Sequence, residues 1–152
     1  MSFVLPLRPV RDPACCDPAD GIAAADGKAM VCLGNDGIVR LSYRQGAVVD
    51  DTDARAVMSV VNSACQGRRR PLLVDLSGLE SVSRAARRVF AIRSRVAGMA
   101  LFGTSPVVCV IATFFMRFHP MPCPAAYFAK RPAALQWLHS VGRGSTASRR
   151  EK

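Results

Sequence analysis

Residues 72–76 (LLVDL) form an apolar run that only Asp75 interrupts. A strand that is apolar on both faces has to be covered on both faces, which is typical of the central strand of a parallel sheet. The segments around this run alternate between strand-like and helix-like patterns. Such alternation indicates strands joined by helical crossovers, and therefore an α/β fold.

A chain of 152 residues is long enough for one domain of this class. We expect a single α/β domain with a mixed, mostly parallel sheet of about five strands, a β-hairpin first, and four helices. The turn of the hairpin is indicated by residues 35–37 (NDG), which favour positive φ. The expected strands are residues 28–34, 38–43, 72–76, 97–102 and 125–129, and the expected helices are residues 50–66, 83–95, 106–118 and 131–141.

Capping residues mark the ends of two helices. Asp50 or Asp51 can cap the first helix, and Asp53 lies in its first turn, where the helix dipole favours a carboxylate. Ser83 is a suitable N-cap for the second helix. Gly142 is expected to end the last helix.

The two ends of the chain differ from the middle. Residues 1–27 lack periodicity and are expected to be a flexible extension of the domain at residues 28–142. Residues 143–152 are expected to be a basic, flexible tail. Residues 96–116 are 21 uncharged residues, long enough for a transmembrane span, but the turn residues at 103–106 (GTSP) favour a strand, a turn and a helix instead.

Charge is distributed unevenly along the chain, whose formal net charge is +10. Residues 1–80 hold 10 acids and 9 bases, whereas residues 81–152 hold 1 acid and 12 bases. A surface this basic attracts phosphates, acidic proteins and anionic lipids, although a solvated basic face explains the same residues. The six cysteines are spaced irregularly, with no CxxC pair, so reduced thiols and a cytoplasmic location are expected.

The stretch LLVDLSGLESVSRAAR (residues 72–87), in this order of elements, resembles the STAS domain of bacterial anti-sigma-factor antagonists. The chain is similar in particular to divergent STAS/SEC14-like actinobacterial proteins, over about residues 29–141. Residues 75–77 match the Asp-Leu-Ser pattern of the family and Val82 matches a later hydrophobic position. The serine that is phosphorylated in the family falls on Ala85, so the usual phosphorylation switch is not expected. The resemblance implies a non-catalytic regulatory module that binds a protein, such as a regulatory kinase or a sigma-regulatory protein.

The candidate working surface follows the central strand. Ser83 and three arginines at the start of a helix have the composition of an anion site, although an ordinary capped helix explains them equally. The basic loop at residues 68–70 has the composition for acidic lipid headgroups or nucleic acid, or is simply solvated. The residues predicted to bind a partner or an anion are Asp75, Ser77, Ser81, Ser83, Arg84, Arg87 and Arg88.

The helix expected at residues 106–118 is apolar nearly all round, so something has to cover it. The cover is the domain core, a second protomer or an apolar ligand. The last possibility gives an alternative function, a carrier or sensor of a lipid-like anionic ligand. The residues predicted to line such a pocket or interface are Val107, Val110, Ile111, Phe114 and Phe115.

No catalytic signature is present in the sequence. GxSxG, P-loop and GxGxxG motifs do not occur, and the sequence has no Cys/His cluster, so no enzyme, cofactor or metal site is expected. Sequence-specific nucleic-acid binding is not expected either. A homodimer is expected because dimers are the commonest oligomers, and contact with a membrane surface stays open.

Overall fold

The computed structural model describes residues 21–92, 94–103, 106–118 and 123–150. Its main sheet has six strands in the order β1-β2-β3-β5-β7-β8. The first three strands pair antiparallel and the remaining neighbours pair parallel. The strands are β1 (Ile22–Ala24), β2 (Ala29–Leu33), β3 (Val39–Tyr43), β5 (Arg70–Asp75), β7 (Val96–Phe102) and β8 (Ala125–Phe128).

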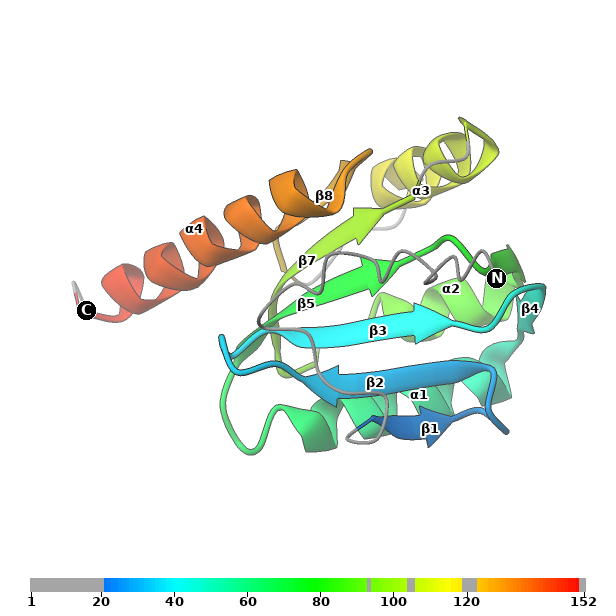
Figure 1. The fold of residues 1–152 in the computed structure, drawn as a ribbon, viewed down its shortest axis with the longest axis horizontal. Helices are drawn as coiled ribbons and strands as arrows, with labels where there is room; N and C mark the ends of the chain where they lie inside the picture. Colours follow the sequence, from blue (N-terminus) through cyan, green and yellow to red (C-terminus); the bar gives the residue numbers. More distant parts are fainter. Residues whose placement is uncertain (1–20, 93, 104–105, 119–122, 151–152) are drawn as a thin grey trace, which may run out of the picture.

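The direction of the crossovers explains how the helices are distributed. The parallel connections from β3 to β5, β7 and β8 all step the same way across the sheet. Right-handed crossovers then place the connecting helices on one face, and Figure 1 shows α1 and α2 together behind the strands. No strand follows α4 in the described chain, and α4 covers the other face of β5 and β7. The helices are α1 (Asp51–Ala64), α2 (Arg84–Phe90), α3 (Pro106–Phe118) and α4 (Arg131–Arg150).

The two faces of the sheet have separate hydrophobic clusters. Val57 and Val61 of α1, Val89 of α2 and Ala112 of α3 belong to one cluster with the inner side chains of the strands. The other cluster joins Leu138 of α4 to residues of β5 and β7. The central strands are therefore buried on both faces, as the LLVDL run predicts. The members of the second cluster are Ile38, Leu73, Ala100, Phe102, Ala134 and Leu138.

A small second sheet joins two loops at the carboxyl ends of the parallel strands. Strands β4 (Ala47–Val49) and β6 (Leu79–Val82) pair parallel. Beside them, the backbone N–H of Gly46 donates to the carbonyl oxygen of Gly78 over 2.8 Å. Gly78 is buried against the backbone of residues 43 and 44, and a side chain has no room there.

The start of α1 is held by a capping box and an ion pair. Asp50 accepts from the backbone N–H of Asp53 over 2.8 Å, and the Asp53 carboxylate accepts from the backbone N–H of Asp50 over 3.2 Å. Lys28 Nζ lies 2.7 Å from Asp53 Oδ2. The hydrogen bond from Lys28 holds the pKa of Asp53 below its usual value, and the same bond raises the pKa of Lys28.

We expect Asp53→Asn to reduce the acid sensitivity of the protein. The lowered pKa of Asp53 means that its stabilising contribution is present above about pH 4 and is lost as the pH falls through the lowered value. At neutral pH the variant should lose up to about 1 kcal/mol of unfolding free energy, because it removes the ion pair with Lys28 and the negative charge in the first turn of α1. Denaturant unfolding at neutral and acid pH should show this difference shrinking in acid. Asp51→Asn, which removes one charge from the same turn and keeps the capping box, is the control, and an equal shrinkage there would contradict the assignment.

Several expected boundaries are wrong. The main sheet has six strands rather than about five, because β1 lies inside residues 1–27, the expected extension. Residues 79–82, expected as loop, pair as β6. Helix α2 ends at Phe90 rather than near residue 95, and α4 continues through residues 143–150, the expected tail, since Gly142 does not interrupt its backbone. Residues 1–20 lie outside the described chain.

Two further expectations can be compared with the structure. Cys65, Cys109 and Cys123 are free, whereas Cys32 is disulfide-bonded, so the expectation of reduced thiols throughout is wrong at Cys32.

The uncharged stretch at residues 96–116 divides between β7 and α3, as expected. Within the described residues, no helix has both the length and the apolar character needed to cross a membrane.

Candidate functional site

The segment from Ser77 to Arg88 runs along the carboxyl-end edge of the domain. Ser77, Ser81 and Ser83 are all exposed. Ser83 caps α2 as predicted, because its Oγ accepts from the backbone N–H of Ala86 over 3.0 Å. The backbone N–H of Ser83 donates to the carbonyl oxygen of Val49 over 2.9 Å, which fixes the start of α2 to β4. The segment is therefore a surface held in one place by the core beneath it.

The helical spacing of Arg84, Arg87, Arg88 and Arg95 predicts one basic stripe, which is only partly present. Arg84 and Arg88 are exposed, but Arg87 is half-buried. Arg87 Nε is buried and has no hydrogen-bond partner among the described residues. Arg95 lies beyond the end of α2, so it does not extend the stripe. The exposed arginines of this surface are therefore Arg84 and Arg88.

Asp75, which is also predicted to bind a partner or an anion, lies on a different face of the sheet from α2. It follows Leu73 on the face of the sheet that α4 covers, whereas α2 packs on the opposite face. Asp75 Oδ1 accepts from the backbone N–H of Ser77 over 2.9 Å, and Oδ2 lies 3.5 Å from Nη2 of Arg131. The guanidinium of Arg131 also lies 5.0 Å from the ring centroid of Phe102. Asp75 therefore holds the β5–β6 turn and the start of α4.

Ala85, in the first turn of α2, is exposed. The position that the family resemblance associates with phosphorylation is thus at the surface but has only a methyl group. On the same side, β6 places Ser81 directly opposite Val48 of β4. Val48 is an apolar side chain that is 51% exposed. The surface consequently combines serines, guanidinium groups and one exposed valine.

The apolar helix α3 has a buried side and an exposed side. Ala112 is buried, and Cys109 and Met116 are half-buried at helical spacing from it. Val110, one of the predicted pocket residues, is 67% exposed, so it faces outward rather than into the core. The side chains of the other four, Val107, Ile111, Phe114 and Phe115, lie outside the described residues.

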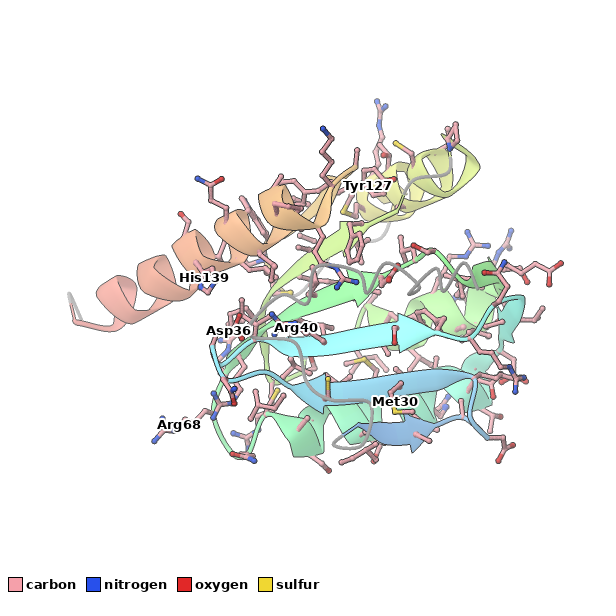
Figure 2. All side chains as sticks on the ribbon, viewed as in Figure 1. Met30, Asp36, Arg40, Arg68, Tyr127 and His139 are labelled. Carbon is pink, nitrogen blue, oxygen red and sulfur yellow. The ribbon has the colours of Figure 1, made fainter. Side chains whose placement is uncertain are left out.

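Figure 2 shows a charged cluster where α4 passes the β2–β3 turn, which sequence analysis missed. Two guanidinium nitrogens of the buried Arg40 donate to the two carboxylate oxygens of Asp36, over 3.0 and 3.1 Å. Arg40 also donates to the carbonyl oxygen of Ile38 over 3.1 Å. His139 Nε2 of α4 lies 3.9 Å from Asp36 Oδ2. The signal in the sequence that could have found this pair is the opposite charge of Asp36 and Arg40, four residues apart across the expected turn.

Burial keeps several reactive groups protonated. It raises the pKa of the Cys65 and Cys123 thiols, and of the Tyr43 and Tyr127 hydroxyls. The Tyr127 hydroxyl donates to the carbonyl oxygen of Gly103 over 2.6 Å (Figure 2). Thiols in this state are weak nucleophiles. In the described part of the chain, no group of three or more metal-ligating side chains comes together.

Comparisons with known proteins bear on the fold more than on the site. A family model described as "Domain of unknown function (DUF7793)" matches residues 32–142. A crystal structure from Arthrobacter sp. FB24, of a protein with unknown function, is 42% identical, over 71% of this chain and 90% of that one, with a TM-score of 0.30. No curated protein matches the chain.

A second solved structure supports the expected fold. It is an uncharacterized protein of the DUF3478 family with a SpoIIAA-like fold, from Shewanella loihica PV-4. It is 16% identical and matches over 76% of this chain and 94% of that one, with a TM-score of 0.52. This likeness concerns the fold alone, and it supports the STAS-like architecture that residues 72–87 indicate.

Proposed function

Because the chain belongs to the family described as a domain of unknown function (DUF7793), we propose its function from its own surface. It is a non-catalytic regulatory module that binds another protein through the edge surface, defined here as Val48, Ser77, Ser81, Ser83, Arg84 and Arg88. The SpoIIAA-like neighbour supports a module of this kind through its fold. The partner belongs to the class of regulatory kinases or sigma-regulatory proteins that the STAS resemblance implies.

The observation that carries this proposal is the exposed Val48 beside Ser81. An anion site consists of donors alone, whereas protein interfaces combine a desolvated apolar centre with a polar rim. Arginine is enriched at such interfaces. A valine more than half exposed on a short strand, with Ser81 opposite it and two exposed arginines on the adjoining α2, has the composition of an interface.

The edge surface is also preorganised. Ala86 and Val89 of α2 are buried, and the capped Ser83 is bonded to β4. A surface that is already in place loses little conformational entropy on binding. The exposed methyl group of Ala85 leaves the interaction without a phosphorylation step at that position.

Site-specific photocrosslinking tests the proposal in the organism that makes the protein. A photoreactive residue in place of Ser81 should crosslink to one discrete protein, and the same residue in place of Ser59, exposed on α1, should not. Val48→Glu with Arg84→Glu should abolish that crosslink without changing the melting temperature by more than a few degrees, because both side chains are exposed.

Equal crosslinking from both positions, or a crosslink that survives the double substitution, would exclude the edge surface. Native mass spectrometry of the same purified chain covers the alternative function. A bound small molecule that leaves on denaturation would favour a carrier or sensor instead. The spectrum also tests the expected homodimer.

A further inference from the structure

Four arginines gather at the amino ends of β5 and β7, at the opposite end of the parallel strands from the edge surface. Arg68 and Arg69 lie between α1 and β5, Arg70 is the first residue of β5, and Arg95 directly precedes β7. These four are called the amino-end arginines below. Arg68, Arg69 and Arg95 are exposed, and Arg70 is half-buried. Figure 2 shows Arg68 pointing away from the rest of the molecule.

Hydrogen bonds hold three of these four arginines in place. Arg95 Nη1 donates to the carbonyl oxygen of Gly67 over 3.3 Å, and Arg69 Nη2 donates to that of Val96 over 3.4 Å. Arg70 Nε donates to the carbonyl oxygen of Cys65, at the end of α1, over 3.0 Å. Each bond uses one of the five N–H donors of a guanidinium. The arginines support the loops, and their remaining donors form a fixed basic surface.

Among the described residues, little negative charge offsets this surface. The sequence has no acid between Asp53 and Asp75, and none between Glu80 and Glu151. The carboxylate at this end of the sheet, Asp36, is already engaged by Arg40 in a bidentate pair. A charge excess without local compensation produces a positive potential that attracts an anionic surface.

An exposed isoleucine accompanies the amino-end arginines. Ile92 is 60% exposed just after the end of α2. It precedes Arg95 by three residues, so the two Cα atoms lie within about 11 Å of each other. Nucleic-acid backbones are bound by cationic groups and stacking aromatic side chains rather than by an aliphatic one. An aliphatic side chain among guanidinium groups instead suits the interface of an anionic bilayer, where both contribute to binding.

We infer that the amino-end arginines and Ile92 form a binding surface for anionic phospholipid membranes. The guanidinium groups contact lipid phosphates, and Ile92 enters the boundary between headgroups and acyl chains. The protein binds the membrane peripherally and reversibly, because one apolar side chain and a few charges are a weak anchor. The arginines of this surface lie at the opposite end of the parallel strands from Val48, Ser77 and Ser81, so a membrane-bound chain keeps that part of the edge surface open to a protein partner.

Vesicle cosedimentation of the full chain tests this inference. Vesicles of phosphatidylcholine with phosphatidylglycerol should bind the protein, pure phosphatidylcholine vesicles should not, and added salt should weaken the binding. Arg68→Gln/Arg69→Gln/Arg95→Gln should lower the partition coefficient roughly 100-fold, from the usual contribution of each basic residue. Ile92→Ser should lower it roughly 10-fold at unchanged charge.

The matched control is Arg44→Gln/Arg55→Gln/Lys130→Gln, which removes the same charge from exposed positions near the other end of the parallel strands. It should retain most of the binding. Arg68→Glu/Ile92→Ser is a second test variant that leaves the three arginine–carbonyl bonds intact. It should also lose binding, so the outcome does not depend on whether the triple variant folds.

Equal losses in the test and control triples would mean that only net charge matters, and would overturn the inference. If Ile92→Ser binds the vesicles as strongly as the wild-type protein, Ile92 does not contact the bilayer. The argument for a membrane over another anionic partner would then fail, and the inference would be overturned. RNA binding that needs the amino-end arginines, without a preference for phosphatidylglycerol vesicles, would assign the surface to nucleic acid instead.

Discussion

Gly78→Ala should destabilise the protein by about 3 kcal/mol, because the added methyl group would collide with backbone. A Cβ at Gly78 would meet the carbonyl oxygen of Tyr43 well inside contact distance, and the carbonyl carbon and oxygen of Arg44 at 2.9 Å. Backbone atoms cannot rotate away as a side chain can, so the β3–β4 and β5–β6 loops would have to separate. For a domain of this size, the loss corresponds to a fall of about 6–12 °C in melting temperature.

Gly46→Ala is the comparison variant. Gly46 lies in the same pair of loops, but alanine is unfavourable there for a different reason. Gly46 has a φ of +80° and no atom within 4 Å of a built Cβ, so alanine there meets backbone strain but no collision. That strain is worth about 1–2 kcal/mol. The melting temperature measured by calorimetry should therefore be clearly lower for Gly78→Ala than for Gly46→Ala. The reverse order would show that the two loops are not closely packed.

Asp36→Ala should cost about 3 kcal/mol of unfolding free energy. The substitution removes both charge-assisted hydrogen bonds to the buried Arg40 and the bond that Asp36 Oδ1 accepts from the backbone N–H of Ile38. Hydrogen bonds to charged groups contribute about 1.5–3 kcal/mol each, and losing two partially compensated ones gives this magnitude. Denaturant unfolding measures the change directly.

A double-mutant cycle isolates the pair from the rest of the turn. The interaction energy obtained from Asp36→Ala, Arg40→Met and the double variant should exceed about 1 kcal/mol for residues in direct contact. Asp36→Asn keeps an oxygen for Ile38 and removes the charge, so it should fall between the wild-type protein and Asp36→Ala. Additive single changes would show that the two side chains act independently.

Local patterns predicted the elements that have strong periodicity or a cap. The helix that Asp50 caps and the helix that starts at Pro106 are where the sequence indicates them, because the signals are the side chains that form those ends. The missed strands β4 and β6 are three and four residues long and pair with each other across α1 and β5. Short strands of this kind depend on contacts distant in sequence, and propensity says little about them.

The candidate site shows the same limit. Ser81, Ser83 and Arg84 lie within four consecutive residues, so a local sequence motif is enough to predict that they share one surface. The partner of Asp75 is Arg131, 56 residues later, and only the packing of α4 brings the two together. Ile92 is likewise exposed because α2 ends at Phe90. The sequence did not predict this boundary, because the arginines that follow Phe90 favoured a helix that continues to residue 95.

The order of strands in the main sheet has a consequence for synthesis on the ribosome. From β1 to β8, spatial order follows chain order, so every new strand adds at an edge and none has to enter between two already paired. The sheet can thus grow as the polypeptide emerges. The last step is different, because in the described part of the chain Leu73 and Ala100 are covered by Ala134 and Leu138 of α4, which is made after all the strands. A nascent chain that stalls before α4 would expose that apolar face to chaperones and proteases.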